Sequence, residues 1–220
     1  MWFLLAAFVF AVLESLAVWK QIRGLEFIAK PAVMVMLFAY LWASIGLTGV
    51  PLWFGLGILL SLAGDVFLLW LDRFFLFGLV SFLIGHIAYM VGFNSPTSPL
   101  TLWGMLLAVM IGLGGVRVLR RILSVMAEKG QTRMRGPVAI YGAVISLMLL
   151  SAMLKLTDPD WGAGASLLVA LGAFLFFLSD IVLAWNKFVS PIQNGRMLNI
   201  GLYHLGQIML AAGVVVQFAS

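Results

Sequence analysis

The chain has 220 residues, of which 64% are hydrophobic and only 10% are charged. A soluble domain carries about 25% charged residues, so the chain has too few polar residues to cover a water-soluble particle, and we expect an integral membrane protein. The net charge of +5 does not indicate a nucleic-acid partner, because the basic residues lie between apolar runs, where they set membrane topology. The absence of cysteine excludes disulfides, thiolate catalysis and cysteine-ligated zinc.

Apolar runs of about 20 residues, long enough to span a bilayer, follow one another along the whole chain. They cover residues 1–19, 28–47, 51–71, 74–93, 99–116, 137–154, 161–185 and 197–218. Stretches rich in Gly and Pro, such as LTGVP and NSPTSP, separate several of them, and a basic connection spans residues 117–136. The first run has no basic residue before it and no small-residue cleavage site after it, which predicts a membrane helix and not a removed signal peptide. The sequence therefore predicts an all-α, polytopic transmembrane bundle of eight helices, forming one domain over residues 1–220.

The basic residues predict the orientation of this bundle. The loops after the first, third, fifth and seventh runs hold 12 of the 13 Lys and Arg residues. These are Lys20, Arg23, Lys30, Arg73, Arg117, Arg120, Arg121, Lys129, Arg133, Arg135, Lys187 and Arg196. Lys155, beside Asp158 and Asp160, is alone on the opposite side. Because cytoplasmic loops carry an excess of Lys and Arg, we expect those four loops in the cytoplasm and both termini to be non-cytoplasmic.

Two aspartates lie inside the apolar runs, where an ionisable side chain is costly and usually marks a functional path. Asp65 and Asp180 each lie about 8–9 Å from the cytoplasmic end of their predicted helices, at ~1.5 Å per residue. Carboxylates at matched depth in one leaflet can share a site. The alternative is two structural ion pairs, Asp65 with Arg73 and Asp180 with Lys187.

Further polar residues lie at similar depth near the cytoplasmic end. Glu14 is near the inner end of the first run, and Lys30 with Pro31 is expected to open the second helix, where Pro suits the first turn. Lys30 either snorkels to the interface or points inward, where it can neutralise a phosphate. His86 and Tyr89 share one helix face, but His86 lies about 18 Å into its predicted helix, deeper than the aspartates.

The last run carries a polar stripe of Asn199, Tyr203 and Gln207, with Arg196 at its mouth. Hydrogen bonding between helices explains each such residue taken singly. Taken together, they predict a polar pocket that opens to the inner leaflet. GDVFLL (64–69) and GHIAY (85–89) are also echoed by SDIVLA (179–184) and YHLGQ (203–207), as a parallel duplication of four helices would produce.

Several chemistries lack their motifs. The sequence has no G-x-S-x-G elbow, HExxH pair, Walker loop or dinucleotide fingerprint. Its two histidines exclude a site of three His ligands, and no spacing supports His86, His204 and one aspartate as zinc ligands. We therefore predict no metal and no cofactor, which leaves chemistry by paired carboxyl groups.

The motifs KP (30–31), GD (64–65), GHIAY (85–89), SDIVLAWNKF (179–188) and the Tyr203/Gln207 pair resemble the YhhN-like lysoplasmalogenase family of integral membrane proteins. They keep their order through most of the chain. One departure is His204, where the family usually has a second tyrosine, so the resemblance assigns no role to His204.

The resemblance implies hydrolysis of the vinyl ether bond of a membrane lysophospholipid, a lysoplasmalogen, to a fatty aldehyde and glycerophosphoethanolamine or glycerophosphocholine. Such an enzyme needs one protonated carboxyl, which protonates the vinyl ether, and one carboxylate, which stabilises the oxocarbenium ion and guides water. Asp65 and Asp180 are the expected pair, with either one as the acid. Lys30, Asn186 and Lys187 are expected near the lipid phosphate, and Glu14, His86, Tyr89, Tyr203 and Gln207 in support.

Two other functions fit the same residues. Buried aspartates, a mid-membrane histidine and a four-helix repeat also describe a proton-coupled transporter of a small molecule or lipid. A non-catalytic lipid-binding or scaffold protein would use the polar residues only to hold its helices together. Either way we expect a multi-pass membrane protein, in the cytoplasmic membrane if the host is bacterial.

Overall fold

The structure is a computed structural model that describes residues 1–99 and 101–219, apart from the side chains of residues 71 and 72. Within these ranges the chain forms eight α-helices and no strand, as predicted. They are α1 (Trp2–Trp19), α2 (Arg23–Ile45), α3 (Val50–Leu68), α4 (Leu71–Phe93), α5 (Leu102–Glu128), α6 (Arg135–Leu154), α7 (Ala163–Ala184) and α8 (Gly195–Phe218). All eight are long and apolar enough to cross a membrane.

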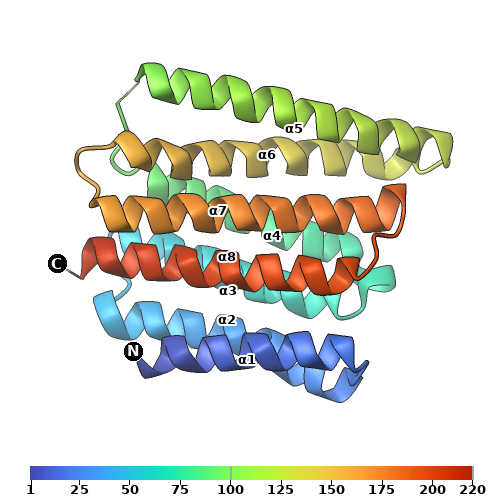
Figure 1. Ribbon diagram of the computed structural model, residues 1–220, viewed down its shortest axis with the longest axis horizontal. Helices are drawn as coiled ribbons and strands as arrows, with labels where there is room; N and C mark the ends of the chain where they lie inside the picture. Colours follow the sequence, from blue (N-terminus) through green and yellow to red (C-terminus); the bar gives the residue numbers. More distant parts are fainter. Residues whose placement is uncertain (100, 220) are drawn as a thin grey trace.

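The helices alternate in direction, so that successive helices are antiparallel (Figure 1). The connections after α1, α3, α5 and α7 lie at one end of the bundle, and the N- and C-termini lie together at the other. α8 is the central helix, because it packs against α1, α2, α3 and α7, whereas α5 lies at the edge against α6. Most of the Lys and Arg residues lie in these four connections or on the helix segments next to them, so we call this end the basic end.

Three helix boundaries differ from the prediction near the basic end. α5 continues to Glu128, well past the predicted end at residue 116, because the segment RVLRRILSVMAE consists mostly of good helix formers. The predicted start of that run includes residue 100, which lies outside the described residues. α2 begins at Arg23, so Pro31 lies inside the helix and not in its first turn. Neighbouring helices make this tolerable in membrane helices, where they help to satisfy the backbone group that proline leaves free.

The third boundary that differs is the end of α7. This helix continues without a break into a π-helical turn, Trp185–Val189. Lys129, from the connection between α5 and α6, donates hydrogen bonds to the backbone carbonyls of Phe188 (3.1 Å) and Val189 (2.7 Å). These carbonyls at the end of the segment are the groups that a helix leaves without intrahelical partners. Asp180 is thus nine residues, and not five, from the end of its helical segment.

Glycines bring the central helices into close contact. A Cβ atom added at Gly206 of α8 would lie 2.8 Å from the carbonyl oxygen of Gly172 of α7, and one added at Gly172 would lie 2.7 Å from that of Gly206. In α3, a Cβ at Gly57 would lie 2.4 Å from the ring of Tyr89 in α4. Small residues let membrane helices approach closely where no hydrophobic force drives them together. Both α3–α4 and α7–α8 use this device.

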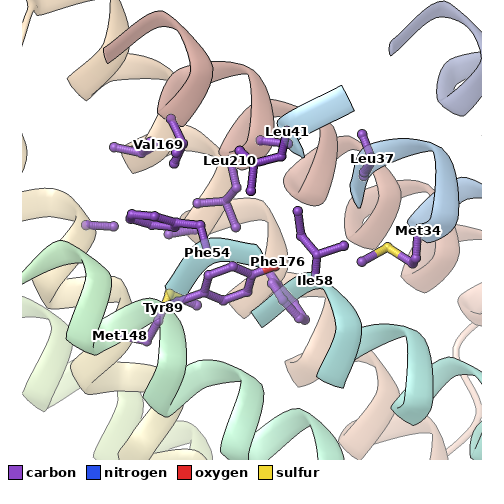
Figure 2. Close-up of a cluster of buried hydrophobic side chains, with 14 of the residues drawn as sticks. Met34, Leu37, Leu41, Phe54, Ile58, Tyr89, Met148, Val169, Phe176 and Leu210 are labelled. Atoms are coloured by element: carbon purple, nitrogen blue, oxygen red, sulfur yellow. The ribbon is translucent and has the colours of Figure 1, made fainter. Parts of the chain in front are cut away.

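The apolar core lies where these two helix pairs meet. Phe54, Ile58, Tyr89 and Phe176 form its centre, with Leu210 from α8 (Figure 2). Phe176 is in contact with the rings of Phe82 and Tyr203, with centroids 6.1 and 5.2 Å apart. The aromatic core therefore reaches the polar residues at the middle of the bundle.

A buried ion pair closes the other end of the bundle. Lys155 Nζ lies 2.8 Å from Asp158 Oδ2, and the lysine lies over the ring of Trp161. Asp158 also accepts hydrogen bonds from the Ser98 hydroxyl (2.9 Å) and the Asp160 N–H (3.1 Å). This cluster joins the connection between α4 and α5 to that between α6 and α7.

Candidate active site

Asp65 of α3 is buried between α2 and α8. The hydroxyl of Tyr203 donates a hydrogen bond to Asp65 Oδ2 at 2.6 Å, and Lys30 Nζ of α2 lies 3.5 Å from Oδ1. Only 1% of the Asp65 side chain is exposed. Lys30, and not Arg73, is therefore its cationic partner.

Asp180 of α7 has a different pair of partners. The hydroxyl of Tyr141, on α6, donates a short hydrogen bond to Asp180 Oδ2, and His86 Nε2 of α4 lies 3.4 Å from the same oxygen. His86 Nε2 also lies 3.0 Å from the Tyr141 oxygen, which closes a triangle of three polar groups. With 12% of its side chain exposed, Asp180 is the more accessible of the two aspartates.

His86 therefore meets an aspartate, although its depth in the predicted helix argued against direct contact. The ends of the predicted helices were a poor guide to depth, because both segments run further at the basic end: α4 begins at Leu71, and α7 continues through the π-helical turn to Val189. The histidine ring also packs on Phe176, with centroids 4.7 Å apart.

The two carboxylates belong to separate networks. The ring of Phe176 is in contact with both His86 and Tyr203, so an aromatic side chain separates the two sets of partners. Asp65 of the α3–α4 pair binds Tyr203 of α8, and Asp180 of the α7–α8 pair binds His86 of α4. The echoed segments thus exchange partners across the bundle. A joint role for the two aspartates stays a prediction.

Two further buried networks flank Asp65. Tyr89 donates to Gln207 Oε1 at 2.7 Å, and Gln207 Nε2 donates to the Ser61 hydroxyl at 3.1 Å. Glu14 of α1 forms a short contact with His204 Nε2 of α8. His204, to which the sequence assigns no role, is therefore the partner of Glu14.

A cleft of about 680 Å³ opens at the basic end between α2, α3, α7 and α8. We call it the basic cleft. Its wall carries the basic side chains of Arg23, Lys30, Arg73, Lys187 and Arg196. Glu26 also faces it and forms a short ion pair with Arg196. An excess of cations in one concave site suits an anionic ligand such as a phosphate.

Lys30, Lys187 and Asn186, the residues expected near the lipid phosphate, all line the cleft but have different contacts. Lys30 both lines the cleft and touches Asp65, and Lys187 lies 4.6 Å above the ring of Phe75. Asn186 also lines it, but its carbonyl oxygen accepts the Ile192 N–H at 2.7 Å. Asn186 therefore holds the turn between α7 and α8.

A narrow cavity of about 40 Å³, which we call the neck, adjoins the basic cleft. It shares Leu68 and Leu183 with the basic cleft, and Asp180 and Tyr141 line it further in. A basic site and a carboxyl group thus line two neighbouring cavities.

Sequence reasoning missed Tyr141 and Glu26. The chain has only four tyrosines, and a hydroxyl inside an apolar run must find a partner when buried, so Tyr141 carried a usable signal. Glu26 lies just before the predicted start of the second helix, in a segment read as a loop.

Curated relatives cover most of the chain. Lysoplasmalogenase TMEM86A of Homo sapiens is 32% identical over 163 residues, which are 72% of this chain and 63% of that protein. Lysoplasmalogenase TMEM86B of Mus musculus is 29% identical over 211 residues, 94% of this chain and 84% of that protein. The Homo sapiens TMEM86B protein is 25% identical over 210 residues.

No solved structure matches this chain significantly. The family assignment therefore comes from the sequence, and it agrees with the eight apolar helices described above. Residues 25–214 match the YhhN family, so the match includes Lys30, Asp65, His86, Asp180 and Tyr203. The chain therefore belongs to the YhhN family.

Proposed function

We propose that this protein is a lysoplasmalogenase, which hydrolyses the vinyl ether bond of a lysoplasmalogen within the membrane. The names of the curated relatives support this reaction. The products are a fatty aldehyde and a glycerophospho-ethanolamine or -choline. These names do not favour the alternative function, a proton-coupled transporter.

The observation that carries the proposal is the position of Asp180, in a neck that adjoins a basic cleft. The phosphate of a lysolipid binds in the cleft, near Lys30 and Lys187. The ether oxygen is a few atoms from that phosphate along the glycerol, so it reaches the neck. The carboxyl group then lies beside the bond to be broken.

Asp180 is the acid in this mechanism. Tyr141 and His86 both engage its Oδ2, so we assign the catalytic proton to Oδ1. The proton passes to the β-carbon of the vinyl ether, whose π electrons form the new C–H bond, and an oxocarbenium ion results. The Asp180 carboxylate then stabilises this cation, as a carboxylate does in glycosidases.

Water completes the reaction. It adds to the cationic carbon and returns its proton to Asp180, with His86 and Tyr141 keeping the carboxylate in place. The hemiacetal so formed transfers its hydroxyl proton to the glycerol oxygen as the carbon–oxygen bond breaks. One water is consumed, and an aldehyde and an alcohol leave.

Asp65 acts on the phosphate side. Through its 3.5 Å contact it holds Lys30 at the wall of the basic cleft, and Tyr203 fixes the carboxylate from the other side. In place of the shared acid–base role expected from the sequence, which stays a prediction, we propose that Asp65 is a positioning residue, and that its loss weakens substrate binding more than the chemical step. Tyr89, Gln207 and Glu14 hold α8 in the register that this requires.

The basic end faces the cytoplasm, and both termini are non-cytoplasmic. This orientation follows from the excess of Lys and Arg in the four connections and the adjoining helix segments at that end. The basic cleft then opens to the headgroups of the inner leaflet, in the cytoplasmic membrane if the host is bacterial. Substrate arrives from that leaflet without leaving the bilayer.

Aldehyde release tests the proposal. The purified protein in detergent micelles is given a lysoplasmalogen and, separately, the ester-linked lysophospholipid of the same chain length. We expect aldehyde from the vinyl ether only. Asp180→Asn should lower kcat between about a hundredfold and ten-thousandfold, the usual contribution of a general acid.

Asp160→Asn is the matched control, since Asp160 is exposed at the opposite end of the bundle. It should keep wild-type activity. If the folded wild-type protein releases no aldehyde, the proposed reaction is wrong, and uptake driven by a proton gradient becomes the assay of choice.

A further inference from the structure

A third cavity, in addition to the basic cleft and the neck, lies between α5, α6 and α7 and borders the neck. We call it the side groove. It has a volume of about 180 Å³, and its lining is apolar except for Tyr141, Asp180 and Ser146. The groove therefore ends at the carboxyl group that the proposed mechanism uses.

The three cavities adjoin in a line. The side groove and the neck share Val138, Tyr141, Asp180 and Ala184 in their walls. The neck in turn shares Leu68 and Leu183 with the basic cleft. A basic site, one carboxyl group and an apolar site thus follow one another in neighbouring cavities.

The groove lies where the bundle meets the bilayer. Its outer wall is α5, the edge helix, whose Met110, Leu113 and Val116 are exposed. Three of its lining residues are glycines, Gly112, Gly115 and Gly142, which have no side chains to fill the groove. A volume well below the roughly 300–1,000 Å³ of drug-sized pockets suits one unbranched chain.

The order of these chemistries matches one molecule. A single-chain phospholipid carries an anion, then an ether or ester, then one hydrocarbon chain. We propose that the side groove binds the hydrocarbon chain of the lysolipid substrate, and that Gly112 limits how long a chain can be seated. This inference rests on the proposed function, since it places the chain of that substrate.

Gly112→Leu is the direct test. A Cβ at Gly112 meets no atom within 4 Å, so the side chain can start there without displacing protein atoms. Gly114 is equally exposed, also meets nothing within 4 Å, and does not line the groove, so Gly114→Leu is a matched control. Both changes favour the helix by removing a glycine.

The measurement is kcat/KM for two lysoplasmalogens, one with a short and one with a long alkenyl chain. A blocked groove displaces the vinyl ether from Asp180, and a small misplacement of reacting atoms costs on the order of a hundredfold. We expect about that loss for the long chain in Gly112→Leu, and little change for the short chain. Gly114→Leu should match the wild type with both. An unchanged chain-length profile in an active Gly112→Leu protein would overturn the inference.

A second measurement does not depend on turnover. The wild-type protein is labelled with a lysophosphatidylethanolamine that carries a diazirine at the end of its chain, and the labelled peptides are mapped. Label on the groove-facing segments of α5 and α6 supports the inference, and label confined to other helices overturns it. Equal competition by a two-chain phosphatidylethanolamine also overturns it, because the groove would then hold bulk lipid.

The two failures are distinguishable. Groove labelling without aldehyde release refutes the proposed reaction and supports a chain-binding groove. Aldehyde release with an unchanged chain-length profile and label elsewhere refutes the groove alone.

Discussion

At the scale of single residues, nearly every buried polar side chain has a specific partner from another helix. An unsatisfied polar group in hydrocarbon costs several kcal/mol, which explains why Asp65, Asp180 and Gln207 are each bonded across the bundle. Within the described residues, the buried side-chain atoms without a hydrogen bond are Glu14 Oε1 and the Nδ1 atoms of His86 and His204. All three atoms belong to the networks described above. The buried polar atoms without a hydrogen-bond partner therefore lie in or beside the candidate site.

Tyr141→Phe tests the Asp180 network. The change removes the hydroxyl that bonds Asp180 and contacts His86, but it keeps the ring and its packing. We expect kcat for aldehyde release to fall about a hundredfold, with the unfolding temperature nearly unchanged. Tyr40→Phe, on α2, is the control and should leave kcat unchanged. Wild-type kcat in Tyr141→Phe would show that Asp180 works without the tyrosine.

Asp158 gives a prediction about acid stability. Burial raises the pKa of Asp158, but hydrogen bonds from Lys155, the Asp160 N–H and Ser98 outweigh it, so its pKa lies below the ordinary value. A group whose pKa is depressed by folding stabilises the protein above its unfolded pKa, about 4, and loses that contribution as the pH falls through the folded pKa.

The unfolding temperature of the wild type should therefore drop between neutral pH and pH of about 3 by more than that of Asp158→Asn. Thermal unfolding in the same detergent at both pH values measures this. Asp160→Asn serves as the control and should behave as the wild type. Equal drops in the wild type and Asp158→Asn would rule out Asp158 as a source of acid sensitivity.

The polar residues of the site were predictable from the sequence, but their pairing was not. A polar residue in an apolar run is conspicuous, so Asp65, Asp180 and His86 stand out. Which polar side chains pair depends on the rotation and depth of each helix, and a run of apolar residues does not specify either. Tyr141 shows the limit, because its hydroxyl indicates that it needs a partner but not that the partner is Asp180.

At the scale of elements, glycine determines how closely the helices pack. The α7–α8 contact depends on Gly172 and Gly206, whose backbones face each other without side chains between them. This contact positions Asp180 and Tyr203, which lie one to two turns away on the same two helices. Element packing and site geometry are therefore coupled.

Gly206→Ala should destabilise the protein by about 1–3 kcal/mol, the usual cost of overpacking. The added Cβ would lie 2.8 Å from the Gly172 carbonyl oxygen and 2.9 Å from the Phe176 nitrogen, so the backbones must separate. Gly201→Ala, on the same helix, meets nothing within 4 Å and is the matched control. Thermal unfolding in detergent compares the two, and equal stability would mean that α7 and α8 separate freely.

The number of helices was predictable from the sequence, because spans of about 20 apolar residues are set by bilayer thickness. The ends of α2 and α5 and the π-helical turn were not. At those positions the chain leaves the hydrocarbon, and helix propensity and local hydrogen bonds decide where a helix stops. Lys129 is an example, since its bonds to the end of the Trp185–Val189 turn join segments about 60 residues apart.

At the scale of the whole molecule, the bundle is polarised. The four connections with the adjoining helix segments that carry most of the basic residues lie at one end, and the termini lie at the other (Figure 1). Reporter enzymes that are active only outside the cytoplasm, fused to either terminus, should both be active. A fusion in the connection between α5 and α6 is the control and should be inactive. Any terminus that reports from the cytoplasm would reverse the proposed orientation.

The exchange of partners between helix pairs also bears on how the protein is made. Asp65 and His86 leave the ribosome well before Tyr203, Tyr141 and Asp180, although Lys30, the other partner of Asp65, is made earlier. The first four helices therefore carry Lys30 paired with Asp65, but both polar networks stay incomplete until α6 to α8 are added. The site is thus assembled only when the last helix, which brings Tyr203, has joined the bundle, so that under the proposed function a partly made chain is inactive.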